Sequence, residues 1–64
     1  MNKVKFKKLK ENTLEELENK VNEFLASEEG RQYQLLNVSV EKVEEQKFPH
    51  NEEVLSAILT LVNQ

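Results

Sequence analysis

Few residues of this chain are placed to do chemistry. His50 is the single histidine, and it stands beside Asn51, Glu52 and Glu53, a spacing that matches no standard metal ligand set. Glutamates are abundant, but the pattern gives none the burial or like-charged neighbour that would tune its pKa for acid/base catalysis. Cysteine is absent and Gly30 is the only glycine, which excludes thiol chemistry and a glycine-rich phosphate loop. We therefore expect a protein that is not an enzyme, with no metal and no cofactor.

The charges of the chain are unevenly distributed. Residues 1–10 contain five lysines and no acidic residue, whereas the rest of the chain sets twelve glutamates against four basic residues. The basic end could bind an anion, and the acidic part could imitate one. Binding to nucleic acid is not expected, because the chain is acidic overall and Phe6, the one aromatic residue of the basic end, is predicted to point into the core.

The length of 64 residues predicts a single domain, 1–64, with a marginal core. Chains this small usually gain stability from disulfides, a metal or a partner subunit. The absence of cysteine removes both disulfides and thiolate metal sites. Association with other copies is then the remaining source of stability among the three. The sequence shows neither a secretory signal nor an apolar run long enough to cross a membrane, so we expect a cytoplasmic protein without membrane contact.

The first half of the chain predicts a strand and then a helix. Residues 3–10 begin by alternating, with Val4 and Phe6 predicted to face the core and the lysines the other side. Leu9 breaks this alternation, which predicts either a bulge at residues 7–8 or a contact with the start of the helix. Thr13 and Glu16 form a capping box, and apolar residues at helical spacing predict a helix over residues 14–29, ended by a left-handed Gly30.

The second half predicts two more strands. From Tyr33 the period is two, with Leu36, Val38 and Val40 on one face and Tyr33 and Leu35 on the other. Residues 44–53 are polar, contain the only proline and predict a connecting loop. Residues 54–62 carry no charge; their spacing also fits a helix, but their β-branched residues favour a strand.

These elements predict an α+β fold of order β-α-β-β. The last strand is apolar on both faces, so we place it at the centre. The prediction is a three-stranded antiparallel sheet of order 1-3-2 with one helix on one face, similar to half of a ferredoxin-like fold.

The sheet face away from the predicted helix is the candidate binding surface. Alternation brings aliphatic, hydroxyl and lysine side chains together there, a mixture typical of subunit interfaces and of pockets shared between subunits. A monomer with a partly apolar sheet face is the alternative. The candidate ligand-binding or interface residues are Lys5, Lys7, Tyr33, Asn37, Ser39, Ser56, Ile58 and Thr60.

The chain resembles very short sporulation-associated and phage-borne proteins of Gram-positive bacteria. The resemblance lies in the runs Val4–Phe6, Leu14–Leu25, Leu36–Val40 and Ser56–Leu59, and the chain differs by its longer loop with a proline. The family implies no established activity, so no site residues are carried over. Small phage proteins of this size often act by binding, either as inhibitors of a host protein or as oligomers that sequester a signalling nucleotide.

We therefore expect a non-enzymatic, homo-oligomeric binding protein that takes a small anionic ligand such as a signalling nucleotide. The first alternative is an inhibitor that docks a host protein through its acidic helix or its open sheet face. The second is a structural subunit of a larger assembly. Oligomeric state, salt dependence and behaviour on isolated expression distinguish the three.

Overall fold

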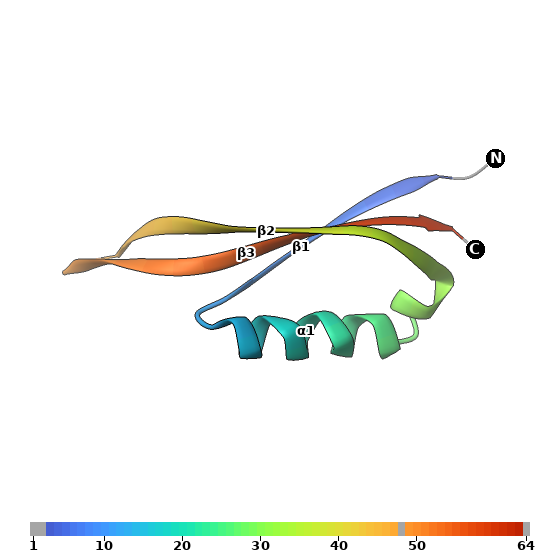
Figure 1. Cartoon of the computed structure of the whole chain (residues 1–64), viewed down its shortest axis with the longest axis horizontal. Helices are drawn as coiled ribbons and strands as arrows, with labels where there is room; N and C mark the ends of the chain where they lie inside the picture. Colours follow the sequence, from blue (N-terminus) through green and yellow to red (C-terminus); the bar gives the residue numbers. More distant parts are fainter. Residues whose placement is uncertain (1–2, 48, 64) are drawn as a thin grey trace.

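The computed structural model describes residues 3–47 and 49–63, which form one α-helix, one short 3₁₀ helix and three strands (Figure 1). The order is β1 (Val4–Glu11), α1 (Leu14–Ala26), η1 (Gly30–Gln32), β2 (Tyr33–Lys47) and β3 (His50–Asn63). β3 lies between β1 and β2 and is antiparallel to both. The predicted α+β fold, its β-α-β-β order and the central last strand are confirmed.

Residues 54–62 belong to β3, so the helical alternative for this segment is wrong. Leu55, Ala57, Leu59 and Leu61 face α1 and alternate with residues on the opposite face. The core consists of Leu17 of α1 with Ala57, Leu59 and Leu61, and more exposed apolar residues pack around it. A core of this size leaves much of the chain without apolar cover.

The predicted loop at residues 44–53 is wrong over most of its length, because β2 includes residues 44–47 and β3 includes residues 50–53; Pro49 lies in a turn, and Phe48 lies outside the described residues. β2 and β3 remain paired as far as Lys47 and His50, beyond the end of β1, and form a two-stranded hairpin that projects from the body of the sheet (Figure 1). Backbone hydrogen bonds satisfy the polar groups of such a ribbon, and its polar side chains can face water on both sides; its stability depends on its continuity with the three-stranded sheet, because a two-stranded hairpin is marginal alone. The hairpin gives the molecule a radius of gyration of 13.5 Å, above the roughly 11 Å of a compact domain of this length.

The helix begins as predicted and ends earlier. The Glu16 amide donates to the Thr13 hydroxyl at 3.1 Å, which is the first half of the capping box. The helix ends at Ala26 instead of residue 29: the Ser27 hydroxyl donates to the Phe24 carbonyl at 2.6 Å and accepts from the Gly30 amide at 3.0 Å. Gly30 is not a left-handed stop but the first residue of η1.

The predicted orientation of β1 is wrong. Lys5, Lys7 and Leu9 pair in register with Leu61, Leu59 and Ala57 and so lie on the helix side, and the register has no bulge at residues 7–8. Leu9 packs against the core. Val4 and Phe6 lie on the opposite face, where their side chains are 57% and 68% exposed.

Lysine can occupy the helix side because its aliphatic stem covers apolar surface while its ammonium group stays at the rim. The Lys5 ammonium lies 5.6 Å from the centre of the Tyr33 ring, and that of Lys7 lies 5.3 Å from the centre of the Phe24 ring. Such cation–π contacts favour this placement. The two lysines therefore flank the core instead of facing away from it.

A bulge in β2 also changes the predicted faces. Leu35 pairs with Leu61 and Asn37 with Thr60, so Leu36 is an extra residue between two regular stretches. The bulge places Tyr33 and Leu35 on the helix side, although the alternation of the sequence assigned them to the other face. Val38 lies on the helix side as predicted.

Candidate functional site

Two apolar surfaces lie uncovered on the described part of the molecule. The first, the open face, is the side of the sheet opposite α1, over which Figure 1 shows no other element. The registers place these residues on it: Val4, Phe6, Lys8 and Lys10 of β1; Gln34, Asn37, Ser39, Glu41 and Val43 of β2; and Val54, Ser56, Ile58, Thr60 and Val62 of β3.

The open face is most apolar near the two chain termini. Val4 lies beside Val62, and Phe6 lies beside Thr60. Next along the sheet, Lys8, Ile58 and Ser39 form one row across the three strands. An exposed aromatic ring, aliphatic neighbours and a polar row beside them have the composition of an interface core and its rim.

Toward the hairpin, side chains of β1 and β2 meet across the open face. The Lys10 ammonium is 2.6 Å from a Glu45 carboxylate oxygen, which joins β1 to β2 across the face. Val54 is only 6% exposed and Ser56 is fully buried. Because Ser56 is fully buried, this predicted site residue is not accessible to a ligand or a second subunit in this conformation. Its hydroxyl has no hydrogen-bond partner among the described residues.

Five of the eight predicted site residues share the open face, and three do not. Asn37, Ser39, Ile58 and Thr60 lie there and are accessible, with Ser56 buried beside them. The other three residues, Lys5, Lys7 and Tyr33, lie on the helix side.

On the helix side these three residues already have neighbours within the chain. Lys5 contacts the Tyr33 ring and lies 4.0 Å from a Glu29 carboxylate oxygen. The lysines on the open face are instead Lys8 and Lys10. Sequence reasoning missed them because it gave β1 the opposite orientation, although the position of Leu9 was a signal for the correct one.

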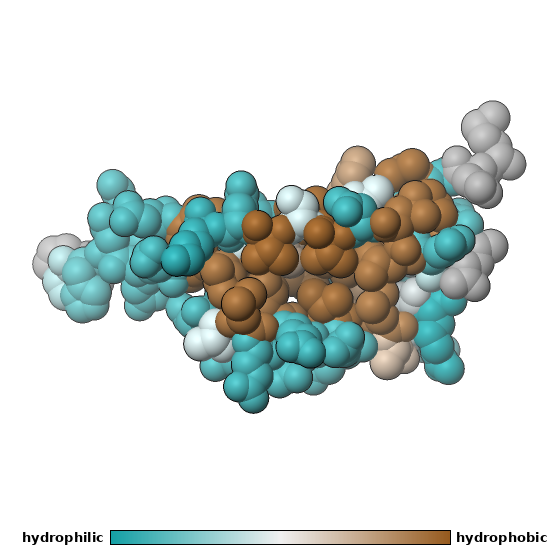
Figure 2. All heavy atoms as spheres, in the orientation of Figure 1, coloured by the Kyte–Doolittle hydropathy of each residue, from teal (hydrophilic) through white to brown (hydrophobic). Residues whose placement is uncertain are grey.

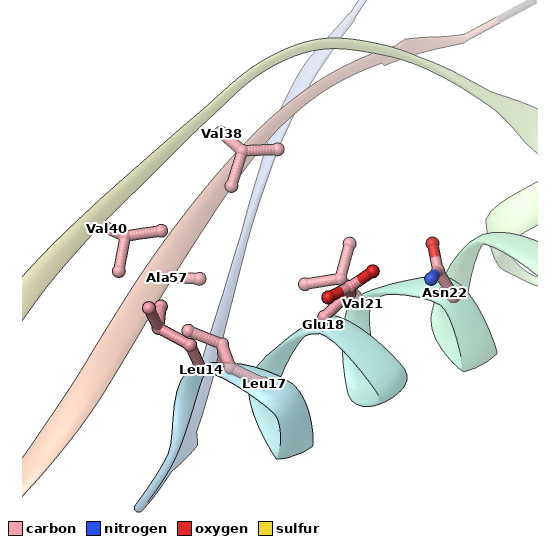
Figure 3. A pocket seen from close by; sticks show the side chains of 8 residues that line it. All are labelled: Leu14, Leu17, Glu18, Val21, Asn22, Val38, Val40 and Ala57. Atoms are coloured by element: carbon pink, nitrogen blue, oxygen red, sulfur yellow. The ribbon is translucent and has the colours of Figure 1, made fainter.

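The second uncovered surface, the groove, lies between α1 and β2 (Figure 3). The helix lies against β1 and β3, so Val38 and Val40 of β2 remain 38% and 47% exposed and Leu14 of α1 66% exposed. Figure 2 shows hydrophobic atoms between the helix and the sheet, and hydrophilic atoms over the hairpin. The groove has a volume of about 330 Å³, and its lining is Leu14, Leu17, Glu18, Val21, Asn22, Val38, Val40 and Ala57.

Among residues 3–47 and 49–63, no three histidine, aspartate or glutamate side chains are grouped so that they could hold a metal ion. His50 is exposed at the start of β3. No helix in these ranges is long and apolar enough to cross a membrane.

An ion pair outside both surfaces joins β1 to α1. The Lys20 ammonium lies 2.6 Å from a Glu11 carboxylate oxygen. This hydrogen bond lowers the pKa of Glu11 below its ordinary value of 4.5, and the same bond raises the pKa of Lys20.

We expect Lys20→Met to raise the pKa of Glu11, because the mutation removes the hydrogen bond and the positive charge that favour the carboxylate. A lowered carboxyl pKa stabilises the folded state above the pKa of the unfolded chain, and this contribution is lost as pH falls through the folded-state pKa. The stability difference between wild type and Lys20→Met should therefore shrink as the pH falls below about 4. Carboxyl NMR titration and urea unfolding measure the two effects.

The control is Lys8→Met, which removes a lysine on the opposite face of the sheet from Glu11. It should leave the titration of Glu11 nearly unchanged. Equal Glu11 pKa values in wild type and Lys20→Met would show that the ion pair is absent in solution.

Comparison of the chain with protein-family models, curated proteins and solved structures gives no significant match. The resemblance to short sporulation-associated and phage-borne proteins therefore stays a prediction.

Proposed function

We propose that this chain is a non-enzymatic binding protein that works as a homo-oligomer, with the open face as a subunit interface. The observation that carries the proposal is the uncovered apolar end of that face, where Phe6 is 68% exposed beside Val4, Thr60 and Val62. A second copy of the chain supplies the cover that the single helix cannot, because α1 lies on the other side of the sheet.

The limited core supports association. Leu17, Val54, Ala57, Leu59 and Leu61 are the buried hydrophobic residues of the described chain. The accessible surface is 5021 Å², above the roughly 4,200 Å² of a compact protein of 7.5 kDa. For a domain of this size, conformational entropy nearly cancels the free energy of apolar burial. Burial of the open face between two copies adds stabilisation without a change of fold.

We propose that a small anionic ligand, such as a signalling nucleotide, is held on the open face at the row of Lys8, Ile58 and Ser39 and at the neighbouring pair Asn37 and Thr60. Lys8 supplies a positive charge, and Asn37, Ser39 and Thr60 supply hydrogen-bonding groups on neighbouring strands. Facing copies duplicate this row around an apolar centre, the usual composition of a ligand pocket. Lys8 takes the role that the sequence assigned to Lys5 and Lys7.

Native mass spectrometry of the purified protein tests the interface. We expect an oligomer, and we expect Phe6→Glu to raise the dissociation constant at this interface roughly a hundredfold, because it places a charge in the apolar centre. The control Asn19→Glu adds the same charge at an exposed helix position outside the groove and should leave the mass unchanged. A wild-type monomer at high concentration, or a Phe6→Glu protein with the wild-type oligomeric mass, would show that the open face is not an interface.

The same experiment tests the ligand. Small molecules released on denaturation should include an anionic compound, and Lys8→Glu should reduce its amount while the protein stays folded. An oligomer that releases no anionic compound would contradict the ligand and leave the interface standing. Loss of the compound in Lys5→Glu but not in Lys8→Glu would show that the ligand binds on the helix side of the sheet.

A further inference from the structure

The groove is open toward the free edge of β2. Val38 and Val40 form its wall on the sheet side, and Leu14 and Glu18 form part of its wall on α1 (Figure 3). β2 has a hydrogen-bonded neighbour on one side only, since it is an outer strand of the sheet. Along Asn37–Val43 its other edge has no strand partner among the described residues and lies next to exposed valines, the combination that a further strand can cover.

The two outer edges of the sheet differ in protection. β1 carries four lysines in eight residues, which oppose the approach of a second β1. β2 is bulged at Leu36, but from Asn37 to Val43 it is regular and contains three valines, residues that favour strands. Its charged residues in this stretch are Glu41 and Lys42, of opposite sign. The β2 edge is therefore the one that a second copy can approach without repulsion.

We propose that β2 pairs antiparallel with β2 of a second copy, about a two-fold axis that passes beside Val40 and is perpendicular to the sheet. This interface is distinct from the open face and goes beyond the proposed function. The result is a continuous six-stranded sheet with both helices on one side. The two grooves then lie next to each other across the axis.

The position of the axis follows from the strand itself. Val40 is the midpoint of the regular stretch Asn37–Val43, so this register pairs that stretch with its copy over its full length. It sets Ser39 opposite Glu41 of the partner subunit. Axes beside Glu41 or Lys42 would set two like charges directly opposite each other, which is unfavourable.

Charge complementarity at the groove supports this register. Glu18 lies on the rim of the groove, and none of the ion pairs found in the described residues includes it. Lys42 pairs with Leu55, which places it on the helix side. With the axis beside Val40, Lys42 of the partner subunit stands opposite Val38, on the side of the groove where Glu18 lies. In this arrangement Glu18 forms an ion pair with Lys42 of the partner subunit, and the two-fold symmetry repeats the pair.

Cysteine substitution tests the register, because the chain has no cysteine of its own. Val40→Cys places two thiols opposite each other at the axis, within the Cα separation that a disulfide requires. We expect mild oxidation to convert most of the Val40→Cys protein to a disulfide-linked dimer. Glu44→Cys is the matched control: it lies on the same strand, but its two copies are roughly 27 Å apart in this register, so it should stay monomeric on a denaturing gel.

Charge exchange tests the contact with Glu18. We expect Glu18→Lys and Lys42→Glu each to raise the dissociation constant of this interface about tenfold, and the double variant to recover most of the loss. Absence of the Val40→Cys disulfide, or single variants with the wild-type oligomeric mass, would overturn the proposal. Protection of the groove by a different protein with no self-pairing of β2 would overturn it as well.

The two interfaces can fail independently. If both form, the wild-type protein is a tetramer, and Phe6→Glu reduces it to a dimer that still gives the Val40→Cys disulfide. If the mass responds to Phe6→Glu and no disulfide forms, the β2 pairing is wrong and the open-face interface stands. If the disulfide forms and Phe6→Glu leaves the oligomeric mass unchanged, the β2 pairing stands and the open-face interface is wrong.

Discussion

Leu59→Ala should lower the free energy of unfolding by about 3 kcal/mol, which is the cost of removing a buried leucine and leaving a cavity. Leu59 is fully buried on β3, between Lys7 on β1 and Val38 on β2. A domain of this length has a total stability of only roughly 3–10 kcal/mol, so the variant should be largely unfolded or close to it. Urea denaturation followed by circular dichroism measures the loss.

The matched control is Leu14→Ala, the same change at a helix residue that is 66% exposed. It should change the free energy of unfolding by less than about 1 kcal/mol, because little apolar surface is lost and alanine favours the helix. Equal losses in the two variants would mean that the core does not centre on Leu59.

Gly30→Ala should destabilise the protein by about 2 kcal/mol or more, because the added methyl group overlaps the end of α1. A Cβ at Gly30 would overlap the Phe24 carbonyl oxygen and lie 3.0 Å from the Leu25 Cα. Both are backbone atoms, so neither can rotate away. The connection from α1 to β2 would have to move, and with it the Ser27 hydroxyl that joins Phe24 to Gly30.

Thermal unfolding of Gly30→Ala and of the control Glu28→Ala measures this effect. Glu28 is exposed in the same connection, and its replacement should change stability by less than about 0.5 kcal/mol. A Gly30→Ala protein as stable as wild type would show that the connection has room to relax.

The hairpin shows where local chemistry misled prediction. Glutamates, a proline and a histidine in residues 44–53 are typical of loops, yet β2 and β3 pair through almost all of this stretch. Glu44 stands opposite Glu53 and Glu45 opposite Glu52, arrangements that cross-strand preferences disfavour. The ladder continues because its apolar part, residues 54–62, fixes the register of both strands. Long-range pairing outweighs local composition here.

The candidate site was predictable in part, for the same reason. Ile58 and Thr60 were assigned to the correct face because β3 is regular and its core face is unambiguous. Tyr33 was assigned to the wrong face because the bulge at Leu36 reverses the alternation of the strand, and no residue in this stretch indicates a bulge. Lys5 and Lys7 were assigned wrongly because, in most amphipathic strands, apolar residues such as Val4 and Phe6 face the core and lysines face water.

The sequence by itself determined the kinds of elements, their order, the start of the helix at Thr13 and the central place of the last strand. These follow from local periodicity, capping chemistry and the uncharged run 54–62, which are properties of neighbouring residues. Only the tertiary structure decided which side of β1 faces the helix and where β2 is bulged. A period of two defines two faces but does not name the inner one; that choice depends on pairing with β3 and on the contact of Leu9 with the core. The exposed Phe6 is a consequence of that choice, and the groove beside Val40 results from the position of α1 against β1 and β3.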